Sequence, residues 1–144
     1  MTDRFDPPSE ASHLTTADGE AFIWQPLPGI VLQKASGVLS LPLMQAFLGF
    51  YEPILKPGAR VQVFDDFATL THYTKEARDL VTAFTTAHRS ALEAIHILIA
   101  SKYLALGVTS FGYGVGEDLI FTYSDRRSFL GSLENAIGQA SAIR

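Results

Sequence analysis

The sequence predicts a single α/β domain built on a mixed β-sheet. Short apolar runs typical of buried strands alternate with segments in which apolar residues recur at helical period. Residues 27–29, Leu-Pro-Gly, separate two β-rich segments and indicate an antiparallel hairpin near the N-terminus. Two long strand–helix units follow, and such units imply right-handed crossovers and parallel central strands. The length of 144 residues fits one domain.

The first half of the chain is predicted to contain the hairpin and one helix. Residues 21–27 and 29–34 are the two hairpin strands, and residues 37–40 predict a third, short strand. Ser40 is placed to cap a helix that has Pro42 in its first turn, where proline is tolerated. The apolar stripe of this helix recurs at helical period and consists of Leu43, Met44, Phe47, Leu48, Tyr51, Ile54 and Leu55.

The second half alternates strands and helices. Residues 61–64 predict a buried strand, and an amphipathic helix begins near Lys75. Residues 94–100 are almost continuously apolar, which is typical of a strand covered on both faces. The remaining predicted elements are, in order, a short helix at residues 102–106, a glycine-rich turning segment at 107–116, a strand at 119–123 and a final helix capped by Ser124 or Asp125.

Composition and charge limit the function classes. The absence of cysteine excludes disulfides, thiolate metal sites and thiol nucleophiles, and it fits a cytoplasmic location. Residues 1–20 carry five acids and one arginine, whereas residues 21–144 carry ten acids and ten bases. We therefore expect an acidic flexible tail over residues 1–20 and one folded domain over 21–144. The neutral body argues against nucleic acid, and no apolar run is long enough to span a bilayer.

The most distinctive segment is residues 61–78, VQVFDDFATLTHYTKEAR. Its apolar start ends in Asp65 and Asp66, a threonine-rich loop containing Thr71 follows, and Thr74 precedes the helix. Open α/β sheets place ligand-binding groups at the carboxyl ends of their strands. Because adjacent strand residues point to opposite faces, the two acids are not expected to act as a close carboxylate pair.

Polar residues after the neighbouring strand extend this candidate site. Ser101 and Lys102 leave that strand at the same sheet edge and are expected to join Asp66 and Thr74 around one crevice. Each residue also has a simpler structural role. Thr74 and Ser101 are typical N-caps, and either Asp65 or Asp66 could anchor loop amides.

The order of elements and several short motifs resemble the SpoIIAA-like branch of the STAS fold. The motifs are a hairpin that ends in Gly-Val-Leu, a strand that ends in Asp65, Tyr73-Thr74-Lys75-Glu76-Ala77-Arg78, the strand His96-Ile97-Leu98-Ile99-Ala100-Ser101, and Tyr123 to Phe129. The resemblance covers residues 22–140. It implies a mixed sheet with an antiparallel N-terminal hairpin, parallel central strands and about four helices, mainly on one side.

In the anti-sigma-factor antagonists of this fold, an Asp-Ser pair at a helix N-terminus carries the serine that a partner kinase phosphorylates. That pair falls on Tyr73-Thr74 in this chain, so the hydroxyl is kept and the acid is not. The resemblance implies Thr74 as the phosphoacceptor. A phosphate there would gain from the helix N-terminus and from Lys75 and Arg78.

Other motifs add little chemistry. The four histidines lack the spacing of a helical zinc motif, and residues 112–116, Gly-Tyr-Gly-Val-Gly, fail the dinucleotide-loop pattern. We therefore expect no metal and no cofactor. Arg126 and Arg127 lie in the first turn of the last helix, where cations oppose the helix dipole, and this hints at an anion or partner contact.

The sequence favours a non-enzymatic bacterial regulatory or protein-interaction domain. Its partner, a regulator or kinase-like protein, would contact a surface made of Asp66, Thr71, Tyr73, Thr74, Lys75 and Arg78. The first alternative is a carrier of lipid or a small hydrophobic ligand, with a pocket between residues 43–55 and the sheet gated by the glycine-rich segment. The second is a small enzyme that uses His72, as a base, and an aspartate. A homodimer through the exposed edge of the hairpin is also expected.

Overall fold

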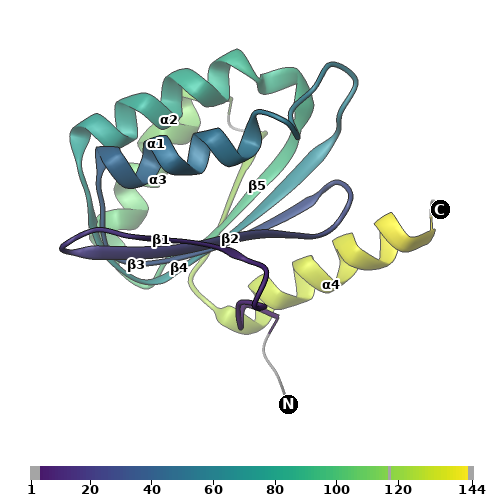
Figure 1. Ribbon diagram of the computed structural model, residues 1–144, viewed down its shortest axis with the longest axis horizontal. Helices are drawn as coiled ribbons and strands as arrows, with labels where there is room; N and C mark the ends of the chain where they lie inside the picture. Colours follow the sequence, from purple (N-terminus) through teal and green to yellow (C-terminus); the bar gives the residue numbers. More distant parts are fainter. Residues whose placement is uncertain (1–3, 117, 143–144) are drawn as a thin grey trace.

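The computed structural model describes residues 4–116 and 118–142 of the chain as one six-stranded sheet with helices on both faces (Figure 1). The strands are β1 (Ser12–Thr15), β2 (Gly19–Leu27), β3 (Ile30–Leu39), β4 (Val61–Tyr73), β5 (Leu92–Leu98) and β6 (Ile120–Tyr123). The helices are α1 (Leu41–Tyr51), α2 (Lys75–Ala87), the 3-10 turn η1 (Arg89–Ala91), α3 (Lys102–Val115) and α4 (Arg126–Ala142).

The strands lie in the sheet in chain order, from β1 to β6. The pairs β1–β2 and β2–β3 are antiparallel, whereas β3–β4, β4–β5 and β5–β6 are parallel. This confirms the mixed sheet with an antiparallel N-terminal hairpin and parallel central strands. Each parallel connection contains a helix, as a crossover within one sheet requires.

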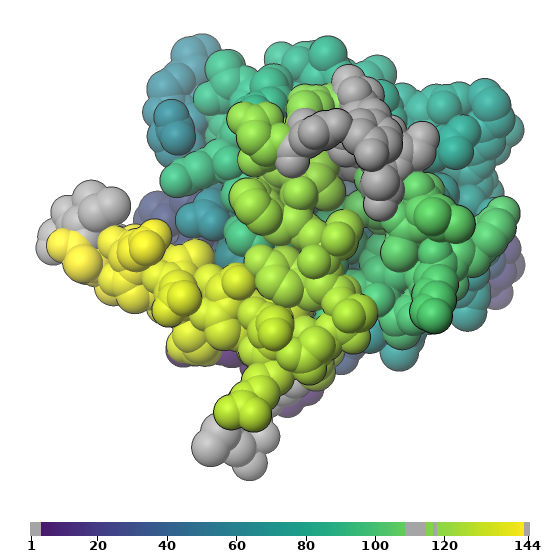
Figure 2. Space-filling model, turned by 180° about the vertical axis from the view of Figure 1, so that it is seen from behind, coloured from purple at the N-terminus to yellow at the C-terminus, as the bar shows by residue number. Residues whose placement is uncertain are grey.

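The helices divide the core into two layers. On one face of the sheet, α1, α2 and α3 cover a large apolar cluster that includes Phe47 and Leu104 (Figure 1). On the other face, α4 buries Phe129 and Leu133 against a smaller cluster. Figure 2, seen from behind, shows β6 in lime near the middle of the view and α4 in yellow at its lower left. Three helices on one side and one on the other agree with the expected arrangement.

The predicted hairpin turn requires its glycine. Gly29 has a φ of 86°, a left-handed conformation that residues with a Cβ adopt only with strain. The strand after it is longer than predicted, because β3 continues to Leu39 instead of breaking at residue 37 to start another strand. Ser40 occupies the N-cap position of α1 with proline in the first turn, although its side chain makes no capping hydrogen bond.

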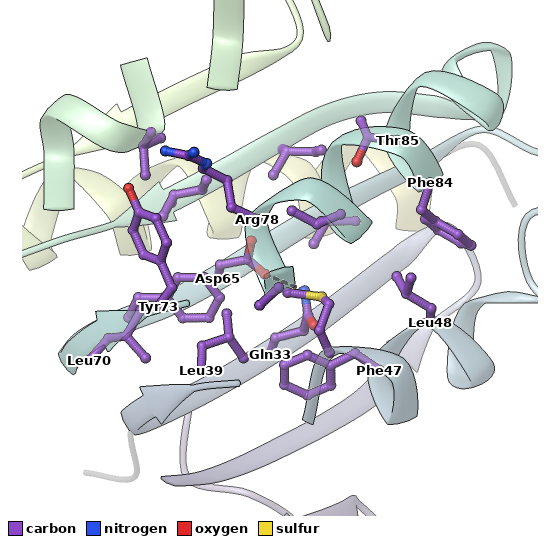
Figure 3. A pocket seen from close by; sticks show the side chains of 18 of the residues that line it. Gln33, Leu39, Phe47, Leu48, Asp65, Leu70, Tyr73, Arg78, Phe84 and Thr85 are labelled. Atoms are coloured by element: carbon purple, nitrogen blue, oxygen red, sulfur yellow. Dashed lines mark hydrogen bonds between the residues drawn. The ribbon is translucent and has the colours of Figure 1, made fainter. Parts of the chain in front are cut away.

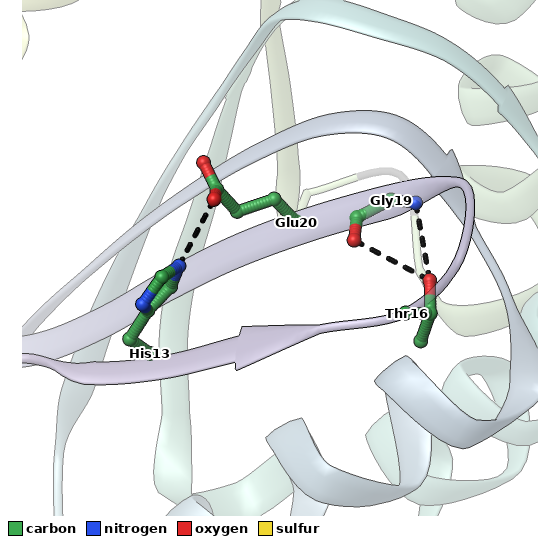
Figure 4. A network of polar contacts seen from close by, with 4 residues as sticks. All are labelled: His13, Thr16, Gly19 and Glu20. Atoms are coloured by element: carbon green, nitrogen blue, oxygen red, sulfur yellow. Dashed lines mark hydrogen bonds and ion pairs between the residues drawn. The ribbon is translucent and has the colours of Figure 1, made fainter.

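The flexible tail expected over residues 1–20 is wrong for the described part of that segment. Strand β1 pairs with β2, and Phe5 is fully buried against Trp24 and Phe129. Figure 4 shows how the β1–β2 turn closes: the Gly19 amide donates to the Thr16 hydroxyl at 3.1 Å. The acidic composition suggested a solvated tail, but a single buried aromatic residue and a short strand are enough to attach the segment to the domain.

Strand β1 also covers the edge on which a homodimer was expected. The free edge of the hairpin would belong to β2, but β2 is hydrogen-bonded to β1 along its first half. The sheet instead ends at two four-residue strands, β1 and β6. Short edge strands offer few unpaired backbone groups, so this arrangement discourages pairing between copies of the chain.

Helix α3 replaces the short helix and flexible glycine segment that were expected after β5. It runs from Lys102 to Val115 and contains Gly107 in its interior. The glycines misled the interpretation because glycine lowers helix propensity by about 1 kcal/mol relative to alanine. Tertiary packing outweighs this cost, since Leu104 and Val108 of the same helix are buried in the larger core.

Candidate functional site

Strand β4 is much longer than the sequence predicted, and this changes the geometry of the candidate site. The strand extends from Val61 to Tyr73, so Asp65, Asp66 and Thr71 lie within it. The expected threonine-rich loop does not exist. Thr71 is exposed and its hydroxyl donates to the carbonyl of Gly37 on the neighbouring strand at 3.0 Å. β-branched and aromatic residues favour strands, which explains why this segment continues the sheet.

Asp66 faces the α4 side of the sheet. Arg126 Nη1 donates to its Oδ2 at 2.9 Å, and the backbone amide of Ala68 donates to its Oδ1 at 3.2 Å. The carboxyl is only 4% exposed. Arg126, which the sequence suggested as an anion or partner contact, therefore pairs with this buried acid inside the domain.

Thr74 separates β4 from α2 and acts as the N-cap of that helix. Its Oγ1 accepts from the backbone amide of Ala77 at 3.2 Å, and the residue is half-buried. Lys75 is exposed and pairs with Asp79, with 2.7 Å between Nζ and Oδ2. Tyr73, Thr74, Lys75 and Arg78 thus lie together around the start of α2.

The crevice that was expected to join Asp66, Thr74, Ser101 and Lys102 is not formed. Seven residues of extended strand, 67–73, separate Asp66 from Thr74, which corresponds to about 25 Å. Asp66 is paired in register with Leu98, so Ser101 follows β5 well short of the end of β4. Ser101 Oγ accepts from the Leu104 amide at 3.3 Å as a cap of α3, and Lys102 is exposed.

The structure instead contains a cavity of about 120 Å³ on the face of the sheet that lies opposite to Asp66, between α1, α2 and the strands (Figure 3). Its position agrees with the pocket expected beside residues 43–55. Most of its lining is apolar, and the side chains labelled in Figure 3 are Gln33, Leu39, Phe47, Leu48, Asp65, Leu70, Tyr73, Arg78, Phe84 and Thr85. Asp65 lies between the aromatic end formed by Phe47 and Phe84 and the polar end formed by Tyr73 and Arg78.

Asp65 is the chemically unusual group of this cavity. It is 6% exposed, and the Gln33 side-chain amide donates to its Oδ1 from the paired position of β3. Among the described residues no cation pairs with it. Burial disfavours the charged form and raises the pKa of Asp65 from 3.8 to about 8, although the hydrogen bond from Gln33 acts in the other direction.

Tyr51 of α1 lines the same cavity and adds a second buried polar group. Its hydroxyl is buried and has no hydrogen-bond partner in the described part of the chain. Burial raises the pKa of Tyr51 well above its ordinary value, and the nearby charge of Asp65 raises it further. Buried hydroxyls nearly always have partners in folded proteins, so this one is an exception.

The polar end of the cavity depends on Gly107 of α3. A methyl group on Gly107 would lie 1.4 Å from the Tyr73 hydroxyl, so only glycine allows the tyrosine ring to pack across the helix. Tyr73 and Arg78 lie at this end in Figure 3, and the charge of Arg78 lowers the pKa of Tyr73 while burial, the larger effect, raises it. The glycine that suggested a flexible lid therefore serves a close contact.

A second polar network lies on the α4 side and centres on His96. Its ring stacks on Phe64 at 4.2 Å, and burial lowers its pKa from 6.5 to about 4. The neutral imidazole carries one N–H. Because Gln62 Oε1 can only accept, Nε2 carries the N–H and donates to it at 3.1 Å, and Nδ1 accepts from the Tyr123 hydroxyl at 2.8 Å. The Tyr123 oxygen also lies 2.9 Å from the Ser132 hydroxyl. These contacts connect all four polar side chains, so we interpret the network as a structural part of the core.

Sequence reasoning placed Asp65 and Asp66 on opposite faces, as the structure does, but it missed the partners Gln33 and Tyr51. The strand alternation contained a usable signal. Asp65 follows Val61 and Val63 at intervals of two residues, so its side chain points to the same buried face of the sheet as theirs. A carboxyl on a buried apolar face is uncommon and marks a candidate site.

Comparison with solved structures identifies the fold. The chain is similar to an uncharacterised protein of the DUF3478 family from Shewanella loihica PV-4, whose crystal structure has a SpoIIAA-like fold. The two share 14% sequence identity with a TM-score of 0.62 over 88% of this chain and 98% of the other. This chain has a SpoIIAA-like fold. The low identity makes this SpoIIAA-like domain a divergent one, and no protein-family model and no curated protein matches it.

Two further findings concern this SpoIIAA-like domain as a whole. Within residues 4–116 and 118–142, no group of three or more histidine, aspartate or glutamate side chains is arranged to hold a metal ion. No helix in the same residues combines the length and apolar character needed to cross a lipid bilayer.

Proposed function

We propose that this SpoIIAA-like domain binds a compact, largely apolar small molecule in the cavity between α1, α2 and the sheet. The observation that supports the proposal is the cavity itself, whose apolar walls surround one buried carboxyl, Asp65. Ligand sites are typically apolar pockets with a few polar groups that fix orientation. An unpaired buried acid costs folding free energy, and such costs are commonly retained where a site needs them.

The volume of the cavity limits the size of the ligand. An apolar cavity of about 150 Å³ binds benzene, so about 120 Å³ limits the ligand to roughly five or six non-hydrogen atoms. Drug-sized ligands occupy pockets of about 300 Å³ or more. This volume restricts the carrier alternative that the sequence suggested. A long acyl chain is too large for the cavity, whereas a small hydrophobic ligand fits.

The proposal concerns binding rather than catalysis. Asp65 is the one carboxyl in the described lining of the cavity, and no histidine lines it. His72, which was considered as a base, lies on an exposed position of β4 beside the Tyr73 ring. A general base needs a reacting group within hydrogen-bond reach, and neither histidine nor nucleophile meets Asp65 there.

Titration with benzene tests the proposal. We expect benzene to shift backbone amide NMR signals of α1, α2 and β4 in the wild-type protein. Val81 lines the cavity, so Val81→Phe should fill it and abolish these shifts. Ile137→Phe is the control, because it also introduces a phenylalanine, but in the opposite core layer, and it should leave the shifts unchanged. Absence of shifts in the wild type, or equal shifts in all three proteins, would contradict the proposal.

Our second candidate function is regulation through a partner protein. The partner would contact a smaller surface than the sequence suggested. It consists of Tyr73, Thr74, Lys75 and Arg78 around the start of α2. The supporting observation is that Tyr73 and Arg78 also line the cavity, so an occupant would touch residues of this surface. Mass spectrometry of the protein from its native cells tests the switch: phosphate on Thr74 supports it, and unmodified Thr74 in every growth phase contradicts it.

A further inference from the structure

Building on the proposed function, we infer that the ligand is uncharged and carries a hydroxyl group that hydrogen-bonds to Asp65. The inference rests on the contacts and the charges at the middle of the cavity. It adds the polar chemistry of the ligand to the size and apolar character proposed above.

Asp65 has unused hydrogen-bonding capacity. Gln33 donates to Oδ1, and within the described residues no donor reaches Oδ2. The side chain is 94% buried and lines the cavity, where the surrounding side chains are mainly apolar. A carboxyl offers several hydrogen-bonding positions, and buried polar groups are nearly always satisfied. A ligand in this cavity is the group best placed to complete the bonding of Oδ2.

The charge of the site favours a neutral partner. No described cation pairs with Asp65, and Arg78 lies towards the other end of the cavity beside Tyr73. Since the pKa of Asp65 is about 8, most molecules hold a neutral carboxylic acid there at neutral pH. Such an acid donates one hydrogen bond and accepts others. A hydroxyl group also donates and accepts, and it introduces no buried charge.

Tyr51 supports the same ligand chemistry. Its hydroxyl is buried without a partner among the described residues, on a side chain that lines the cavity near Asp65. A ligand hydroxyl that reaches Asp65 enters the neighbourhood of a second group that can both donate and accept. The two buried groups come from a strand and a helix on opposite walls, so they would orient a ligand between them.

Three molecules of nearly the same shape, each with six non-hydrogen atoms, test the inference: methylcyclopentane, cyclopentanol and cyclopentylamine. The first has no polar group, the second has a hydroxyl, and the third is a cation at neutral pH. Binding is measured by NMR titration at pH 6.5. We expect cyclopentanol to bind at least tenfold more tightly than cyclopentylamine. Equal or tighter binding of cyclopentylamine, or of cyclopropanecarboxylate as an anionic probe of the same atom count, would overturn the inference.

Substitutions then locate the hydroxyl contact. Asp65→Leu should lower the affinity ratio of cyclopentanol to methylcyclopentane at least fivefold, and the ratio cancels any general change in the cavity. Tyr51→Phe should lower it by a smaller factor. Ser40→Ala is the control, because Ser40 also has a buried unpartnered hydroxyl but does not line the cavity. An unchanged ratio in Asp65→Leu would contradict the inference.

The outcomes separate this inference from the proposed function. If methylcyclopentane and cyclopentanol bind and the ratio of their affinities is unaffected by Asp65→Leu, the cavity binds ligands but Asp65 does not recognise a hydroxyl. If none of the probes and no benzene binds, the proposed function fails and the inference fails with it.

Discussion

Asp65 and Asp66 are consecutive residues of β4, yet of the two only Asp66 has a cation as its partner in the described chain. Arg126 from α4 donates to Asp66 at 2.9 Å, while Asp65 faces an apolar cavity and accepts from the uncharged amide of Gln33. Strand alternation puts the two carboxyls in separate core layers. The same substitution at the two positions should therefore change stability in opposite directions.

Asp65→Asn should stabilise the protein, and more so at higher pH. In the wild type the folded state keeps a proton on Asp65 up to about pH 8, whereas the unfolded chain loses it above pH 3.8. Wild-type stability therefore falls as pH rises from 3.8 to 8. The variant should avoid on the order of 3 kcal/mol of this loss between pH 5 and pH 8, measured by urea unfolding at both values.

Asp66→Asn is the matched control and should destabilise the protein by about 1–3 kcal/mol. The substitution removes the charge that pairs with Arg126, whose side chain is only 38% exposed. A gain in stability from Asp66→Asn, or an equal pH profile for Asp65→Asn and the wild type, would show that the two environments are misassigned.

His96 should make the fold sensitive to acid. Because its pKa is depressed to about 4 in the folded state, the unfolded chain binds a proton below pH 6.5 before the folded protein does. Stability is therefore lost as pH falls from 6.5 to 4, by about 2 kcal/mol at pH 5. His96→Gln should be less stable than the wild type at pH 7, since ring stacking on Phe64 is lost. It should, however, lose less stability than the wild type between pH 7 and pH 5.

This measurement is best made in the Asp65→Asn background, because Asp65 acts in the opposite direction over the same range. Denaturant midpoints at pH 7 and pH 5 for the single and double variants isolate the histidine. An identical pH-dependent loss with and without His96 would refute the assignment.

Gly107 and Tyr73 should be strongly coupled. When Tyr73 is present, Gly107→Ala places a methyl group 1.4 Å from the Tyr73 hydroxyl and 2.7 Å from the ring carbon that bears this hydroxyl. We expect a loss of about 1–3 kcal/mol as the ring is displaced. In a Tyr73→Ala background, the same change should stabilise α3 by up to about 1 kcal/mol through helix propensity. A double-mutant cycle of urea unfolding measures the coupling, and additive effects would contradict the contact.

Thr74 should behave as a cap in stability measurements. Thr74→Ala removes the acceptor for the Ala77 amide and should cost about 1 kcal/mol. Thr74→Asp should retain most of the stability, because aspartate also caps and its charge favours a helix N-terminus. Thermal unfolding of the wild type, Thr74→Ala and Thr74→Asp measures these differences in stability. Equal stability of Thr74→Ala and the wild type would show that the hydroxyl is free for another role.

The sequence predicted the fold well because the fold follows from local patterns. The Pro28-Gly29 turn, the apolar run before Asp65 and the long strand–helix units each specify an element without reference to distant residues. The failures have two causes. Strand β1 and the glycine-containing α3 have a local composition that is unfavourable or neutral for their structure, and packing decides them. The second half of β4 has β-branched and aromatic residues that favour a strand, but its threonines were interpreted as a loop.

The candidate site was predicted less well because it depends on register. That Gln33 faces Asp65 follows from the pairing of β3 with β4, and the position of Tyr51 follows from how α1 crosses the sheet. Neither relationship is encoded in a short motif. The expected crevice failed for a similar reason: it assumed that β4 and β5 end together, whereas β4 runs seven residues beyond the pairing of Asp66 with Leu98.

The contact between the two ends of the described chain has a consequence for synthesis. Phe5 packs against Phe129, and Arg4 Nε is 2.6 Å from Glu134 Oε1, so an early segment is completed by the last helix. On the ribosome, the sheet face that holds Trp24 and Phe64 stays bare until α4 has left the exit tunnel. The nascent chain therefore exposes an aromatic surface until α4 has been made and has folded onto it, and this is the kind of surface that chaperones recognise.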